Sequence, residues 1–342
     1  MSEPESAQEP PPTYGDLKHK LIRGGIAVVV LVVVGVGLLA LVPGLSGVRS
    51  DIDGASLGWV VAGAGSQLIG VAGAVVFVTL LFADVPQRLT SRMGGAQQAA
   101  NAVLPTAGST GVGYWTLTSI GWGAQRFAER AAVQIIAPAV PNIVLIGVLG
   151  LGMGLGLFSG PSDWWLTWLP GVLAIILIVA AVWAGRWGHR LATRTSRKWL
   201  RSGLEVAATG VTGTVEVFRR WSWRVLGTWV DLFGAIGALY LCLIAVGEHL
   251  PFAVVCMGFL IGQFAQAIPV PGGVGTIDAG VTGALVLYGG GTSISAAGEV
   301  ISHGLALIIP LIVGSVAFAL LPGEIDRQRG PVPSAVEPAT SS

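Results

Sequence analysis

Long apolar runs, each closed by a short polar segment, follow one another along most of this chain. A run of about 20 apolar residues is long enough to cross the hydrocarbon core of a bilayer as a helix. We therefore expect an all-α integral membrane protein. Runs of that length predict six full transmembrane helices, at residues 24–45, 57–82, 131–157, 166–186, 225–247 and 299–321.

The first of these runs follows Lys18, Lys20 and Arg23, an arrangement that also opens a secretory signal. Its apolar part is longer than the core of such a signal, and no small-residue cleavage site closes it. We interpret it as a transmembrane helix that stays attached. Residues 1–17 are rich in Pro and Glu and residues 323–342 are polar, so we expect both segments to be disordered tails.

Two further apolar segments, 94–123 and 252–289, are interrupted by proline and glycine, which break helices. On either side of the first break, the pieces are too short to cross a bilayer singly. That length favours a hairpin that enters the membrane and returns on the same side. The second segment has longer arms, so it fits either a hairpin or two tilted crossings, and its ends emerge together in both cases.

The two breaks resemble one another in sequence. The first reads QAANAVLPTAGSTG from Gln98, and the second reads QFAQAIPVPGGVG from Gln263. If one extra residue is allowed in the first copy, the Gln, the Ala, the Pro and two Gly coincide, and Asn101 stands opposite Gln266. We expect the amide side chains to hydrogen-bond backbone groups that the break frees. The residues that we predict to form the two hairpins are Gln98, Asn101, Pro105, Gln263, Gln266, Pro269 and Pro271.

The distribution of charge gives the chain an orientation. Only 11% of the residues are charged and 53% are hydrophobic, whereas about 25% are charged in an ordinary soluble domain. With the predicted spans, all 19 Lys and Arg except Arg49 fall on one side. Basic residues gather on the cytoplasmic side of a membrane. We therefore predict a multi-pass protein of the cell membrane with both termini in the cytoplasm.

That orientation makes the first hairpin enter from the cytoplasm and the second from the outside. A unit of span, hairpin and span at about 57–157 then recurs upside down at about 225–321, within a membrane domain of residues 18–322. Inverted repeats of this kind commonly place a binding site near the midplane, where the broken helices meet.

Between the two repeats lies a basic loop, residues 187–224, which also contains several tryptophans. Basic and aromatic residues together favour cytoplasmic helices that lie along an anionic lipid surface. Ordinary topology anchoring explains the same composition equally well. The same residue types form nucleic-acid patches, but in a chain built into a membrane we expect no nucleic-acid partner.

Titratable residues inside apolar segments are costly, so they become functional candidates. Asp231 lies in the fifth predicted span. We rank Asp278 first, because it follows the second break in the first turn of the returning helix. It either contacts the substrate or a proton there, or it caps the helix together with Thr276, opposite the positive end of the helix dipole.

Other candidates lie on shared helix faces or beside the breaks. Glu299 and His303 are four residues apart and would form a pair or a proton relay, or else face water near a helix end. Arg126 and Arg130 share the same spacing, and would attract an anionic headgroup or anchor the topology. An exposed helix end suits a phosphate headgroup. We therefore add the glycines at the breaks to the predicted substrate site, namely Gly108, Gly111, Gly272, Gly273 and Gly275.

Enzyme signatures in the sequence are weak. It contains no HExxH and no Walker loop. Asp51 and Asp53 form a DxD triplet like that of some glycosyltransferases, which we interpret as a solvated turn. Cys242 and Cys256 fall in apolar segments, where they indicate neither a disulfide framework nor a zinc site. We predict no enzymatic activity, no metal and no cofactor.

The segment IPVPGGVGTID at residues 268–278, followed by an apolar glycine-rich helix, resembles the signature of the lysylphosphatidylglycerol synthase transmembrane region, or flippase-like domain family. The resemblance covers about residues 20–322. Family members usually carry Glu where Asp278 stands. Leu104 and Pro105 match the usual pattern of the first break, but the following GSTG lacks the charged residues that many members have.

The resemblance implies a lipid-translocating membrane domain, and we expect no synthase activity because the soluble aminoacyl-transfer domain is not seen. Similarity of fold does not identify the cargo. We predict a flippase-like transporter that moves a polar lipid or lipid-linked precursor between leaflets, with anionic or lipid-linked headgroups as its partners. Two alternatives stay open. One is an integral membrane enzyme in which Asp278, Glu299 and His303 act as acid and base, and the other is a non-transporting accessory protein.

Overall fold

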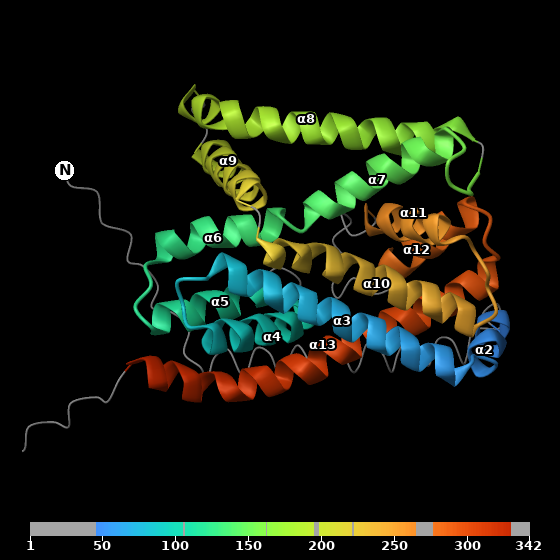
Figure 1. Cartoon of the computed structure of the whole chain (residues 1–342), viewed down its shortest axis with the longest axis horizontal. Coiled ribbons are helices and arrows are strands. Elements are labelled where there is room, and N and C mark those ends of the chain that lie inside the picture. Colours follow the sequence, from blue (N-terminus) through green and yellow to red (C-terminus); the bar gives the residue numbers. More distant parts are fainter. Residues whose placement is uncertain are drawn as a thin grey trace, which may run out of the picture.

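The structure is a computed structural model that describes residues 46–104, 107–161, 163–194, 198–220, 222–264 and 276–329. All regular secondary structure in these residues is helical, and most of the longer helices run along the long axis of the molecule (Figure 1). Five helices are long and apolar enough to cross a bilayer, which indicates a multi-pass membrane protein. They are Leu57–Leu81, Ala124–Gly154, Trp164–Gly185, Trp223–Ala245 and Thr292–Gln328.

These five helices overlap five of the predicted spans, and the remaining one, 24–45, lies outside the described residues. The predicted span 131–157 is made of two helices, α6 (Ala124–Ile136) and α7 (Ala139–Gly154). They meet at Pro138, which has no backbone N–H with which to continue the ladder of helical hydrogen bonds.

The centre of the molecule is the antiparallel pair α3 (Leu57–Leu81) and α10 (Leu226–Ala245). Glycines line both faces of this contact. A Cβ added at Gly234 would lie 2.6 Å from the backbone nitrogen of Gly70, and one added at Gly73 would lie 2.7 Å from the carbonyl oxygen of Gly227. Ser66 also donates a hydrogen bond from its hydroxyl to the carbonyl oxygen of Gly234, at 2.9 Å. The backbones approach this closely because no side chains separate them.

Two shorter antiparallel helix pairs lie toward opposite ends of the molecule (Figure 1). One pair is α4 (Gln87–Val103) with α5 (Ala107–Ser119), and the other is α11 (Phe252–Gly262) with α12 (Thr276–Leu287). These helices flank the two predicted breaks, and the ends next to each break point toward the middle of the molecule. The breaks themselves lie outside the described residues, and with them Pro105, Gln266, Pro269, Pro271, Gly272, Gly273 and Gly275.

The last helix, α13 (Thr292–Arg329), is longer than the predicted span 299–321 and packs along α4. Its extension past Pro322 corrects the predicted tail boundary, since residue 323 lies inside the helix. Packing explains the extension, because Leu321 and Ile325 are buried. Glu324 is also buried, and its carboxylate accepts a hydrogen bond from Arg92 of α4 at 2.9 Å.

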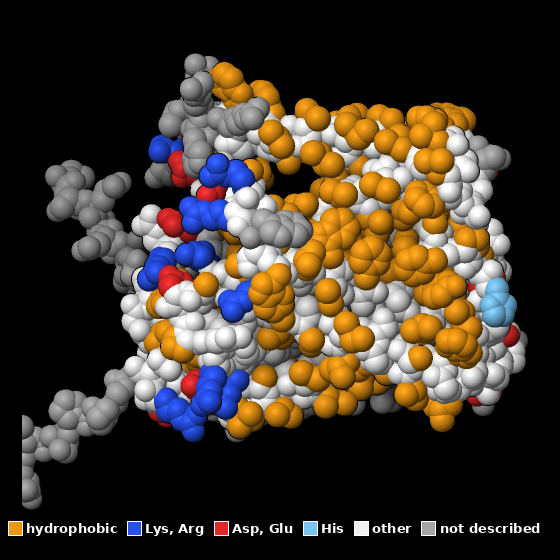
Figure 2. All heavy atoms as spheres, viewed as in Figure 1, with side chains coloured by type: hydrophobic (Ala, Val, Ile, Leu, Met, Phe, Trp, Pro, Cys, Tyr) orange, Lys and Arg blue, Asp and Glu red, His pale blue; other side chains and the backbone are white. Residues whose placement is uncertain are grey.

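Helices α8 (Trp164–Arg194) and α9 (Lys198–Arg219) lie at one side of the molecule, and α8 packs mainly on α7 and α9. Most of the predicted basic loop 187–224 is therefore helical. In Figure 2 the Lys and Arg side chains gather at one end of the molecule, and a broad band of hydrophobic side chains lies between that end and the opposite one. That distribution is typical of a membrane protein whose basic residues lie on one side of the bilayer.

At the opposite end of the molecule, α2 (Ser46–Asp53) packs against the start of α13. Asp51 accepts a hydrogen bond from the hydroxyl of Ser293 at 2.6 Å. The predicted solvated turn at the DxD triplet is thus a helix, because Asp51 is held against the first turn of α13.

Candidate functional site

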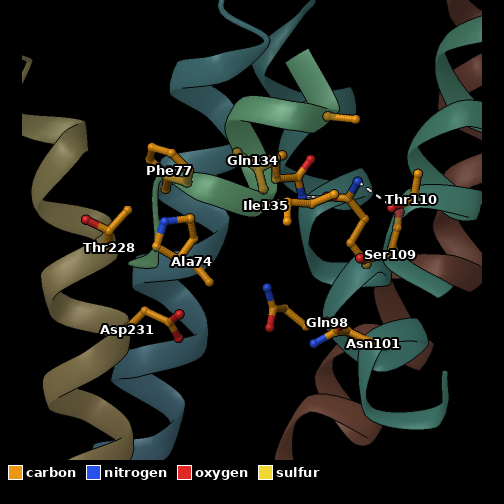
Figure 3. A pocket seen from close by; sticks show the side chains of 14 residues that line it. Ala74, Phe77, Gln98, Asn101, Ser109, Thr110, Gln134, Ile135, Thr228 and Asp231 are labelled. Carbon is orange, nitrogen blue, oxygen red and sulfur yellow. Dashed lines mark hydrogen bonds between the residues drawn. The ribbon is translucent and has the colours of Figure 1, made fainter. Parts of the chain in front are cut away.

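A cleft of about 270 Å³ opens between α3, α4, α5, α6 and α10, among the apolar helices (Figure 3). Its apolar wall includes Ala74, Phe77 and Val78 of α3. The other walls are unusually polar for a site between membrane helices. The polar residues that line the cleft are Gln97, Gln98, Asn101, Ser109, Thr110, Gln134, Thr228 and Asp231.

Asp231 is the one carboxylate among the residues that line this cleft. It belongs to the candidate span Trp223–Ala245 and lies eight residues after Trp223, or about 12 Å along the helix axis. In Figure 3 its carboxylate and the amide of Gln98 point into the same space from α10 and α4.

The glycine contact between α3 and α10 positions Asp231. Gly227 and Gly234 lie four residues before and three residues after it, so all three share one face of α10. A Cβ added at Gly70 of α3 would lie 3.1 Å from the carbonyl oxygen of Asp231. The close approach of the two backbones therefore sets the depth at which α10 presents the carboxylate.

A chain of amide hydrogen bonds holds the opposite wall together. Gln134 of α6 donates from Nε2 to Oε1 of Gln97 at 3.0 Å, and Gln97 donates from Nε2 to the main-chain oxygen of Ser109 at 3.1 Å. Gln97 is only 1% exposed. These bonds join α4, α5 and α6 beside the first break, so Gln97 has the bracing role that we expected of Gln98 and Asn101. Gln98 and Asn101 line the cleft.

Within the part of the chain that the structure describes, the carboxylate of Asp231 forms no hydrogen bond and no ion pair. Lys and Arg are also absent from the described residues that line the cleft. A charged group inside a membrane is costly unless it is paired or protonated. Asp231 is therefore suited to a bound group that brings a positive charge or hydrogen-bond donors.

None of the described residues of the predicted substrate site lines the cleft beside Asp231. Glu299 lies two turns inside α13 and is 4% exposed. It therefore does not face water at a helix end, since α13 begins seven residues earlier. His303 is partly buried one turn further along the same helix. Neither residue lines the cleft beside Asp231.

Asp278 lies in the first turn of α12, as predicted, and its side chain is outside what the structure describes. Gln263 lies at the end of α11. Gly108 of α5 packs against the backbone of Ala100 in α4, which gives it a structural reason to be glycine. Gly111 is partly buried in the same helix, α5.

Arg126 and Arg130 fasten the start of α6 to the end of α3. Arg126 forms an ion pair with Asp84 and lies 4.0 Å from the ring centroid of Trp122. Arg130 donates a hydrogen bond to the main-chain oxygen of Leu81. These contacts favour anchoring over recognition of a headgroup.

Among the described residues, no three His, Cys, Asp or Glu side chains gather as the ligands of a metal ion would. No protein-family model matches this chain, and no curated protein matches its sequence.

Proposed function

We propose that this protein moves a polar lipid or a lipid-linked precursor between the leaflets of a cell membrane, and that the cleft beside Asp231 receives the headgroup. The observation that carries the proposal is a cleft lined by amides, hydroxyls and one carboxylate among helices long enough to span a bilayer. Intramembrane polar residues of this kind mark substrate pathways. The resemblance of residues 268–278 to a flippase-like family supports the same function.

The chemistry of the lining favours a headgroup with hydrogen-bond donors. Gln98 and Asn101 offer both donors and acceptors, whereas Asp231 offers an acceptor and, when ionised, a negative charge. A headgroup that carries an amine or several hydroxyls would satisfy these groups. The ionised carboxylate would repel a headgroup that carries only negative charge. We therefore propose that an anionic headgroup bound here also carries a positively charged group or hydrogen-bond donors.

The arrangement of the helices supports an alternating mechanism. In our proposal, the pairs α4–α5 and α11–α12 are hairpins that enter the membrane from opposite sides, and the basic end is cytoplasmic. The amide chain of Gln134, Gln97 and Ser109 holds α4, α5 and α6 as one body. Movement of this body against α3 and α10 would open or close the cleft, because the cleft lies between them.

Leaflet exchange in liposomes tests the proposal. The purified protein is reconstituted with headgroup-labelled phosphatidylglycerol or its aminoacylated form, and label that reaches the outer leaflet is measured over time. We expect exchange of the aminoacylated lipid above that of protein-free liposomes. Asp231→Asn should slow it by about tenfold or more, since a hydrogen bond to a charged group contributes roughly 1.5–3 kcal/mol.

The matched control is Asp326→Asn, which makes the same change at an exposed position of α13 and should exchange lipid at the wild-type rate. Exchange no faster than in protein-free liposomes would contradict transport and leave an accessory role. A chemically altered lipid product would favour the enzyme alternative.

A further inference from the structure

A second hollow, of about 300 Å³, lies between α6, α7, α8 and α9. Its lining is apolar except for one hydroxyl, that of Thr214. In Figure 2 an opening lies beneath α8 within the hydrophobic band, with basic side chains toward one end. The hollow lies where α8 packs on α7 and α9.

Most of the residues around this hollow belong to the candidate spans Ala124–Gly154 and Trp164–Gly185, so in a membrane it would border the hydrocarbon core. Water gains nothing there, because it needs polar partners to occupy a cavity. The acyl chains of membrane lipids are apolar and lie next to the hollow in a bilayer. The chemistry of the walls, which include Ile143 of α7 and Ile178 and Val182 of α8, therefore favours a hydrocarbon chain.

Thr214 provides an independent sign of an occupant. Its side chain is 4% exposed, and its Oγ1 has no hydrogen-bond partner among the described residues. A threonine in a helix commonly bonds the carbonyl one turn earlier, as Thr212 does to Ala208 at 2.7 Å. The hydroxyl of Thr214 is left for an oxygen that the described residues do not supply, since a buried polar group without a partner is costly.

Positive charge lies at the end of the same helix. Arg219 and the adjoining Arg220 both bond the carboxylate of Glu216, so together the three residues keep a net positive charge. Arg219 and Arg220 follow Thr214 by five and six residues, so they lie about 8–9 Å further along the helix axis and on the other side of the helix from the hollow. A buried hydroxyl and, beyond it, a basic surface match the order of groups in a glycerophospholipid, in which an ester lies between the acyl chain and the phosphate.

We propose that this hollow binds one acyl chain of an anionic glycerophospholipid, with an ester oxygen on Thr214 and the phosphate at the surface beyond it, in the positive field of Arg219 and Arg220. The lipid comes from the leaflet at the basic end of the molecule. It fills the space beneath α8 and ties α8 and α9 to α7. This site is separate from the polar cleft and does not depend on transport.

Native mass spectrometry of the purified protein, released from nanodiscs of equal parts phosphatidylglycerol and phosphatidylcholine, tests this proposal. Wild type should retain phosphatidylglycerol in preference. Ala181→Phe places a ring in the hollow. If the ring displaces two or more methylenes of the acyl chain, retention of phosphatidylglycerol should fall by more than about tenfold. Val179→Phe makes a similar enlargement on a side chain that is 62% exposed, and should retain lipid as wild type does.

Two more variants address the polar contacts. Thr214→Val keeps the shape and removes the hydroxyl, so retention should fall while the preference for phosphatidylglycerol stays. Glu216→Gln frees both arginines from their carboxylate, and should raise retention of phosphatidylglycerol by about fivefold, the effect of one charge near an anionic headgroup. Retention of phosphatidylcholine should not change.

Equal retention of the two lipids, or equal loss in Ala181→Phe and Val179→Phe, would overturn the proposal. So would a dimer of the wild type that Ala181→Phe dissociates, because a second copy of the chain would then be the occupant.

Discussion

Replacement of Gly234 by alanine tests how the fold positions the polar cleft. Gly234 faces α3 at its closest approach to α10. The added Cβ would lie 2.6 Å from the backbone nitrogen of Gly70 and 2.9 Å from the carbonyl oxygen of Ser66. Because these are backbone atoms, no side chain can rotate away, and the helices must separate.

Overpacking of this kind costs about 1–3 kcal/mol. Alanine returns up to about 1 kcal/mol through its better helix propensity. Separation of the helices also strains the hydrogen bond from Ser66 to Gly234, and such a bond between membrane helices contributes about 0.6 kcal/mol. We therefore expect Gly234→Ala to lower the free energy of unfolding by about 1–2 kcal/mol.

Thermal unfolding in detergent micelles, followed by tryptophan fluorescence, measures this effect. Gly65→Ala is the matched control, because a Cβ at Gly65 of α3 meets nothing within 4 Å. It should be as stable as the wild type or slightly more stable. If Gly234→Ala unfolds at the same temperature as Gly65→Ala, the close contact of α3 and α10 does not hold the centre of the molecule as described.

Three other predictions concern the periphery and the cleft. Arg92→Gln leaves the buried carboxylate of Glu324 with the exposed Arg327 as its ion-pair partner among the described residues. It should lower the free energy of unfolding by about 1–2 kcal/mol, and the double variant with Glu324→Gln should recover part of that loss. Cys242 and Cys256 are buried, so the folded protein should resist a water-soluble maleimide, whereas Asn101→Cys in the cleft should react. Hydrogen bonds from Arg220 and Arg219 lower the pKa of the Glu216 carboxyl below its ordinary value of 4.5. Their contribution is present above pH 4.5 and is lost as the pH falls through the lowered pKa. The protection of amides at the end of α9 from exchange, relative to the intrinsic rate at each pH, should therefore fall in acid in wild type but not in Glu216→Gln.

Five of the six predicted spans could be found from the sequence because length and hydropathy alone decide whether a helix crosses a bilayer. Helix ends were harder to predict, because they depend on partners far away in the chain. The extension of α13 past Pro322 needs Arg92 of α4 as a partner for Glu324. Nothing in residues 323–329 signals that contact.

The cleft was predicted only in part. The sequence indicates Asp231, because a carboxylate in an apolar run is rare. It also indicates Gln98 and Asn101, because amide side chains occupy the same two positions before the second break. Gln97 and Gln134 were missed. A signal existed for Gln134, an amide inside the predicted span 131–157, but its contact with Gln97 depends on how α6 folds back over α4.

The most direct test of the proposed function compares Asp231→Asn with Asp278→Asn in one preparation of liposomes that contain the aminoacylated lipid. If the cleft receives the headgroup, Asp231→Asn should lose most of the leaflet exchange, and Asp278→Asn should lose less. Exchange at the wild-type rate in Asp231→Asn, with correct folding shown by an unchanged unfolding temperature, would contradict the account.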